Sequence, residues 1–116
     1  MGKTIPKNFK RSLPYLKMIQ RSRRGVDKID LLRKFPEHVT NDLIEVIYNI
    51  VTGGVKISAS QKAKLRRHKK KLIELVNLPS QKRRRAFIYK QKGGFLNFLL
   101  PAVVPLISNL ISKVVS

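Results

Sequence analysis

The sequence predicts an all-α protein, in which a small helical domain carries a basic helix and linker and an apolar helix forms the C-terminal tail. Three observations lead to this prediction. Apolar residues between positions 41 and 76 recur at the spacing of a buried helical stripe. Residues typical of helix starts precede these runs, and Pro or Gly residues follow them. A length of 116 residues allows one small domain with a modest core.

Two short helices are expected near the N-terminus. The first begins after Ser12, tolerates Pro14 in its first turn and ends at Gly25. The second spans residues 27–35 and stops at Pro36, because the residue before a proline disfavours helical backbone. Their apolar sides hold Leu16 and Ile19 in the first helix, and Ile29 and Leu32 in the second.

The clearest helical pattern lies between Asn41 and Thr52. Thr40 is the expected N-cap, and the pair Gly53 and Gly54 supplies the C-terminal break. One apolar stripe runs along this helix at the spacing of a buried face. It consists of Leu43, Ile44, Ile47, Ile50 and Val51.

A longer basic helix is expected next, opened by the capping box at residues 58–61 and ending near Asn77, before Pro79. On a helical wheel its apolar residues share one arc and its cations the opposite one. The apolar arc holds Leu65, Leu72, Leu75 and Val76. We expect this helix to pack antiparallel to the preceding one, with Ile47 and Leu72 among the buried contacts.

Charge divides the chain into unequal segments. Residues 1–26 form a basic N-terminal segment, 27–78 the small helical domain, 79–94 a basic linker and 95–116 a hydrophobic tail. In total, 26 Lys and Arg face 6 Asp and Glu, a net charge of +20. Such a surplus repels itself in a compact body and is usually neutralised by a polyanion. Nucleic acid is the expected partner, DNA more than RNA, and an anionic membrane is the second candidate.

Ten clustered cations are the candidate nucleic-acid-binding residues. They are Lys64, Arg66, Arg67, Lys69, Lys70, Lys71, Lys82, Arg83, Arg84 and Arg85. The two clusters also resemble a nuclear-import signal. No zinc finger, paired-aromatic signature or base-reading recognition helix accompanies them, so binding is expected to phosphates and indifferent to sequence. The alternative is a solvated helix face and a basic linker without a dedicated partner.

The tail contains eighteen consecutive uncharged residues, 95–112. As a helix they would span roughly 27 Å at ~1.5 Å per residue, near the ~30 Å of a hydrocarbon core. Pro101 and Pro105 weaken such a span. Three interpretations stay open: an interfacial membrane segment, a core helix packed on the stripe of residues 43–51, or a tail anchor. The expected membrane or partner contacts are Phe95, Phe98, Leu99, Val103, Leu106 and Leu110.

Residues for enzymatic or metal chemistry are scarce. The chain has no cysteine, and its two histidines, His38 and His68, lie far apart in unrelated contexts. No Walker loop or dinucleotide motif is present. We therefore expect no catalytic residues, no metal site and no cofactor. The N-terminus lacks the apolar stretch of a secretory signal, so an intracellular protein is expected.

The order of features resembles a viral protein family. A basic helix, the cluster Lys82-Arg83-Arg84-Arg85, the run Gln91-Lys92-Gly93-Gly94-Phe95 and an apolar tail follow one another. This arrangement, over residues 56–111, is similar to the small basic virion core proteins of adenovirus-like double-stranded DNA viruses, adintoviruses and Polinton-type elements. The resemblance implies a protein that condenses the genome, carries a hydrophobic C-terminal segment and is found in the virion and the host nucleus.

The same resemblance implies proteolytic processing. The family's maturation protease prefers an apolar residue, any residue and then two glycines. Val51-Thr52-Gly53-Gly54 approximates this pattern, whereas Gln91-Lys92-Gly93-Gly94 departs further from it. The alternative is that both glycine pairs only end helices.

Three functions thus remain in competition. The first is a DNA-condensing core protein whose tail contacts capsid protein, another copy or membrane. The second is a membrane-active cationic protein that binds anionic lipid and inserts its tail. The third is a ribosomal or other RNA-scaffold protein, which the apolar tail disfavours.

Overall fold

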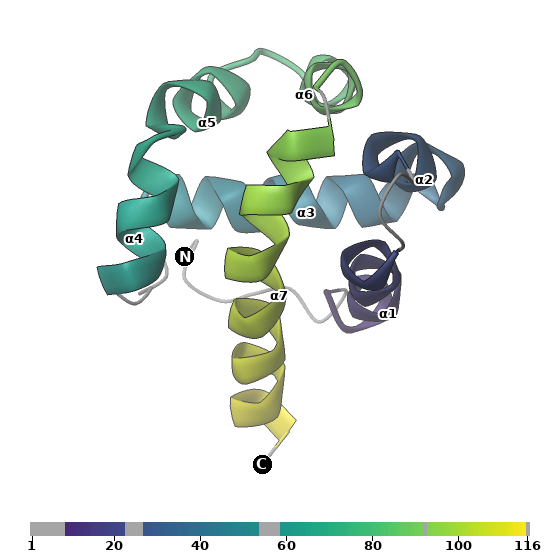
Figure 1. The fold of residues 1–116 in the computed structure, drawn as a ribbon, viewed down its shortest axis with the longest axis vertical. Coiled ribbons are helices and arrows are strands. Elements are labelled where there is room, and N and C mark those ends of the chain that lie inside the picture. The colour runs from purple at the N-terminus through teal and green to yellow at the C-terminus, as the bar shows by residue number, and fades with distance from the viewer. Residues whose placement is uncertain (1–8, 23–26, 54–58, 92, 116) are drawn as a thin grey trace.

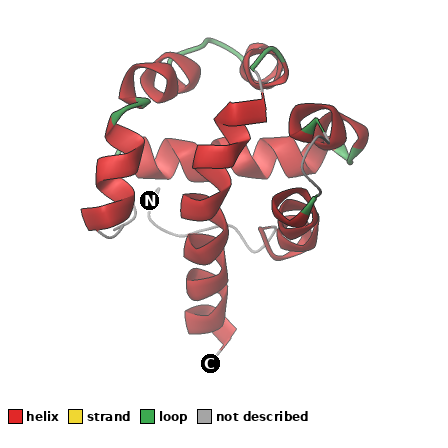
Figure 2. Cartoon of the chain, in the orientation of Figure 1, coloured by secondary structure: helices red, strands yellow, loops and turns green. Residues whose placement is uncertain are grey.

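The computed structural model describes residues 9–22, 27–53, 59–91 and 93–115. These residues form seven helices and no strand (Figure 2), so the prediction of an all-α fold is confirmed. The helices are α1 (Phe9–Arg21), α2 (Lys28–Lys34), α3 (Glu37–Val51), α4 (Ala59–Arg66), α5 (Lys69–Val76), α6 (Gln81–Tyr89) and α7 (Gly93–Val115).

The helices are arranged around α3 and α7 (Figure 1). Helix α7 crosses α3, with α1 and α2 on one side of the crossing and α4 and α5 on the other. Helix α6 lies near the start of α7, and the end of α7 extends away from the other helices. The radius of gyration is 13.3 Å, which matches the compactness of a folded domain of this length, about 13 Å for 100 residues.

Helix α1 begins at Phe9, earlier than predicted, so Ser12 lies inside it. Ser12 is buried and its hydroxyl donates a hydrogen bond to the Asp42 carboxylate of α3. The side chain therefore joins two helices instead of capping its own. Leu16 and Ile19 are fully buried, as their spacing predicted.

The starts of α2 and α3 use different chemistry. The Asp27 carboxylate accepts hydrogen bonds from the backbone N–H groups of Ile29 and Asp30 at 3.0 and 3.2 Å, a typical N-cap. Helix α3 begins at Glu37, directly after Pro36 and without a side-chain cap. Thr40 is therefore not the N-cap that we predicted. It is buried inside α3, where its hydroxyl pairs with the Tyr89 hydroxyl at 2.9 Å.

The predicted break after α3 is confirmed at Gly53. This residue has φ of 76°, the left-handed conformation that glycine adopts without strain. Its N–H donates to the Ile50 carbonyl at 3.2 Å, which closes the last turn. Gly54 and the first residue of the predicted capping box, Ser58, lie outside the described residues.

The expected single basic helix is two helices. Helix α4 ends at Arg66 and α5 begins at Lys69, with a turn at Arg67 and His68. His68 has φ of −112° and ψ of 15°, outside the helical region, and its ring stacks on Phe98 of α7. The sequence pattern did not predict this turn, because Phe98, the residue whose ring stacks on His68, lies 30 positions further along the chain. Ile47 and Leu72 are both buried, and α3 contacts α5.

The segment predicted as a basic linker contains helix α6. The Ser80 hydroxyl caps it by accepting a hydrogen bond from the Arg83 N–H at 3.2 Å. Ile88 is fully buried, and α6 contacts α2, α3 and α5. The cations of this segment thus stand on a packed helix and not on a linker.

The apolar tail forms part of the core. Phe95, Leu99, Val103 and Leu106 are buried in one cluster with side chains of α1 to α6. Helix α7 contacts α1, α2, α3 and α4. The compact part therefore includes both α1 and α7, and does not end near residue 78 as expected from the linker composition. None of the helices in the described ranges is both long and apolar enough to cross a membrane.

The two prolines of α7 lie on its solvent side. Pro101 and Pro105 are exposed, as is Asn97 one turn earlier. A proline inside a helix leaves the carbonyl four residues before it without its usual donor. Residues four apart share a helix face, so water can reach the carbonyls of Asn97 and Pro101. This placement lets the helix continue through both prolines.

Candidate nucleic-acid interface

Eight of the ten predicted binding residues are exposed. They are Lys64, Arg66, Arg67, Lys69, Lys70, Lys71, Lys82 and Arg83, which we call the basic surface. They stand on α4, the turn after it, α5 and the first turn of α6. These helices follow one another around the left and upper edge of the molecule in Figure 1. The structure therefore places two clusters from the sequence on consecutive helices of one fold.

The basic surface has almost no internal neutralisation. Between residues 59 and 91 the chain holds twelve basic side chains and one acidic side chain, Glu74. The ion pairs of the described residues involve Arg11, Lys34 and Arg85, none of which belongs to the basic surface. Two like charges 4 Å apart in water repel by about 1 kcal/mol. Bound phosphates would relieve this repulsion.

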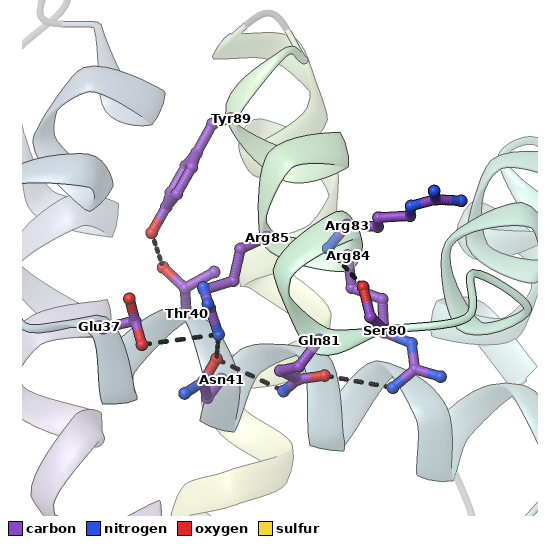
Figure 3. A network of polar contacts seen from close by, with 9 residues as sticks. All are labelled: Glu37, Thr40, Asn41, Ser80, Gln81, Arg83, Arg84, Arg85 and Tyr89. Carbon is purple, nitrogen blue, oxygen red and sulfur yellow. Dashed lines mark hydrogen bonds and ion pairs between the residues drawn. The ribbon is translucent and has the colours of Figure 1, made fainter.

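Arg84 differs from the sequence prediction because its guanidinium is used inside the fold (Figure 3). Its Nη2 donates to the carbonyl of Leu78 at 2.8 Å and to that of Val76 at 3.5 Å. Its Nη1 donates to Gln81 Oε1 at 3.2 Å, the contact drawn in Figure 3. Val76 is the last residue of α5, so the cation satisfies free carbonyls at the negative end of that helix. We therefore remove Arg84 from the set of candidate phosphate contacts.

Arg85 is also held inside the fold. Its Nη1 donates to Asn41 Oδ1 at 3.0 Å and lies 3.6 Å from Glu37 Oε1, and the side chain is only 19% exposed. The same Asn41 oxygen accepts from Gln81 Nε2 at 3.4 Å (Figure 3). Arg85 thus fastens α6 to α3. The sequence held one signal for this contact, because Glu37 and Asn41 are four apart and share a helix face.

A hollow between α4 and α7 adjoins the basic surface. Its volume is about 410 Å³. Ala63, Phe98 and Pro101 provide apolar walls, and Lys64, Arg67, His68 and Asn97 provide polar groups. The rings of His68 and Phe98 stack, with centroids 3.5 Å apart and planes inclined by 11°. Phe98 was predicted to lie in the tail and His68 was assigned to no site, so the sequence did not bring them together.

The tail residues predicted to contact membrane or a partner have little free surface. Phe95, Leu99, Val103 and Leu106 are buried, and Phe98 is partly buried against His68 and Phe95. The Leu110 side chain lies outside the described residues. Among the open interpretations of this segment, the arrangement corresponds to the core helix.

The candidate processing glycines occupy different backbone settings. Gly53 is exposed in the turn after α3, whereas Gly93 and Gly94 are the first two residues of α7. Gly54 lies outside the described residues. Processing at either pair stays a prediction.

In the described part of the chain, no group of three or more His, Cys, Asp or Glu side chains is placed to hold a metal ion. Two buried polar side chains meet between α1 and α3, where the Ser12 hydroxyl donates a hydrogen bond to the Asp42 carboxylate. The exposed Arg11 forms an ion pair with the same Asp42 oxygen, 3.7 Å from its Nε. These contacts join the two helices.

Comparisons with protein-family models, with curated proteins and with solved structures found no match for this chain.

Proposed function

We propose that this protein binds nucleic acid without sequence preference through the basic surface, and that its biological partner is DNA. The observation that carries the proposal is the gathering of eight exposed cations on α4, α5 and α6 with no ion-pair partner among the described residues. Lys and Arg at such density attract phosphates. No base-reading motif accompanies them, so the contacts position the protein without selecting a sequence.

The expected mechanism is release of counterions from the DNA backbone. Each neutralised phosphate contributes about −0.9 to the slope of log K against log salt on B-form DNA. Eight contacts would give a slope near −7 by this rule. Arg84 and Arg85 are excluded from the sum because intramolecular acceptors hold both.

A second group of cations supports a condensing role. Lys10 and Arg21 are exposed on α1, which lies across α7 from α4 (Figure 1). A protein with cations on two sides can hold two DNA segments at once and offset their mutual repulsion. This arrangement supports the genome-condensing role that the viral resemblance implies, with the virion and host nucleus as the proposed location.

The membrane-active alternative has less support. Its central feature was an apolar tail available for insertion, but Phe95, Leu99 and Val103 are each at most 4% exposed. Moving them into lipid would remove them from the core that they share with α1 and α3. We therefore do not propose membrane insertion as the function of this segment.

The proposal is tested by measuring duplex DNA affinity over a range of salt concentrations, using two duplexes of unrelated sequence. We expect equal affinities within a few-fold and a slope near −7, by the rule of about 0.9 per phosphate contact. A slope shallower than about −2, or a preference of about a hundredfold for one sequence, contradicts the proposal.

A matched pair of variants locates the interface. Arg83→Ala removes an exposed cation of the basic surface, and we expect it to make the slope shallower by about 0.9. Lys34→Ala removes an exposed cation that pairs with Asp30 on α2 at 3.3 Å. We expect Lys34→Ala to leave the slope unchanged. Equal changes in both variants would show that total charge, and not this surface, governs binding.

A further inference from the structure

The hollow between α4 and α7 combines three features that a phosphate-binding surface does not require. It has about 410 Å³ of space, two stacked rings in its wall, and an amide group on Asn97. Lys64 and Arg67, which belong to the basic surface, line the same space. Apolar walls with a few converging polar groups are typical of small-ligand sites, which usually measure about 300–1,000 Å³.

The stacked pair offers a platform for another flat ring. His68 and Phe98 are both only partly buried, and both line the hollow. Nucleic-acid bases stack on aromatic side chains with little regard to sequence, at about 1–3 kcal/mol per base. The Asn97 amide is exposed beside this platform. It has the donor and acceptor groups that the edge of a base can use.

The cations are placed to hold the phosphates of the same strand. Lys64 and Arg67 are three positions apart, at the end of α4 and in the turn after it, and both are exposed. Their positive charge complements the phosphates of one nucleotide, and the apolar platform beside them complements its flat base. A paired base in a duplex is stacked inside the helix and cannot reach the platform, whereas an unpaired base is free to enter.

We propose that this hollow binds one unpaired base of a nucleic-acid strand, stacked against the His68–Phe98 pair while Lys64 and Arg67 contact the adjacent phosphates. The inference rests on the proposed function, because it assumes that nucleic acid binds the basic surface. It adds a preference that the basic surface alone does not provide. Duplex DNA has the higher charge density, so charge alone predicts tighter binding to the duplex than to a single strand. A base stacked in the hollow would raise the affinity for the single strand above this prediction.

The test compares a single-stranded thymine oligonucleotide with a duplex of the same length, on the full chain and on two variants. Phe98→Leu removes the aromatic platform but keeps an apolar side chain. Phe87→Leu is the matched control, because Phe87 is also a partly buried phenylalanine packed on the core but lies on α6 outside the hollow. Thermal unfolding of each variant, followed by circular dichroism, verifies the fold.

We expect Phe98→Leu to weaken single-strand binding by about five-fold or more, the loss of one base stack, and to change duplex affinity by less than about two-fold. Phe87→Leu should change neither affinity beyond about two-fold. Equal weakening of both nucleic acids by Phe98→Leu, or no weakening of either, overturns the inference and leaves duplex binding standing. If the unmodified protein binds neither nucleic acid, both the proposed function and the inference fail.

A measurement on the unmodified protein keeps the test independent of variant stability. The chain has two histidines, so the Hε1 ring protons give one NMR signal for each of them. His38 serves as the reference, since it lies edge-on to Tyr15, 6.0 Å between ring centroids, at the contact of α1 and α3. We expect the oligonucleotide to shift the His68 signal upfield through the ring current of the base, and a saturating duplex to shift it less. Equal His68 shifts from both would contradict base stacking in the hollow.

Discussion

Substitution of Leu99 distinguishes a core helix from a free tail. Leu99 is fully buried in the cluster that α7 shares with the other helices. Leu99→Ala removes three carbon atoms from this environment, worth roughly 2.4 kcal/mol at ~0.8 kcal/mol per buried methylene group. The remaining cavity adds to the cost, and measured Leu→Ala losses in cores are about 2–5 kcal/mol. We expect the free energy of unfolding to fall by about 3 kcal/mol.

The change in melting temperature follows from the size of the protein. Unfolding entropy is about 2.1 cal/mol/K per residue near 60 °C, which gives roughly 0.24 kcal/mol/K for a chain of 116 residues. A loss of 3 kcal/mol then lowers Tm by about 12 °C. The assay is thermal unfolding followed by circular dichroism at a helix-sensitive wavelength, in buffer without lipid.

Asn97→Ala is the control for this substitution. Asn97 stands on the same helix two residues earlier but is exposed. Exposed substitutions usually change stability by less than about 0.5 kcal/mol, and alanine favours helix more than asparagine does. We expect Tm of this variant to stay within about 2 °C. Equal Tm values for Leu99→Ala, Asn97→Ala and the unmodified protein would refute the placement of α7 in the core.

Three further outcomes follow from individual contacts. Arg85→Ala should lower the free energy of unfolding by about 1–3 kcal/mol, because the contacts of Arg85 with Glu37 and Asn41 are lost. It should also leave the salt slope of DNA binding unchanged. Arg83→Ala should make that slope shallower and leave the free energy of unfolding unchanged; chemical denaturation measures the stability and salt titration measures the slope. Thr40→Val should cost about 1 kcal/mol in urea unfolding, since it removes the hydroxyl partner of Tyr89, and should add almost nothing when Tyr89→Phe is already present. Replacing Lys69, Lys70 and Lys71 by Gln should make the salt slope shallower by about 2.7, and an unchanged slope would remove α5 from the interface.

Local chemistry was sufficient to predict the class of fold and several of its boundaries. The spacing of Leu43, Ile44 and Ile47 predicted the buried face of α3, because helical periodicity depends only on neighbouring residues. The end of α3 at Gly53 was also predictable, because the left-handed backbone conformation that ends a helix is a local preference of glycine. Thr40 misled the prediction of the helix start, because a threonine can cap a helix or bond to a distant side chain, and the sequence does not show that Tyr89 lies beside it.

The sequence by itself determined the large cationic surplus, the helical content and most of the exposed basic residues, since charge and periodicity are properties of the local chain. Only the tertiary structure decided which cations are free. Arg83 and Arg85 belong to the same run of consecutive cationic residues. Arg83 is exposed, whereas Arg85 donates a hydrogen bond to Asn41, 44 positions away in the sequence. The tertiary structure likewise placed the apolar tail in the core and brought His68 to Phe98. The physical reason is that burial and partner choice depend on which helix faces meet, and residues far apart in the sequence supply those faces.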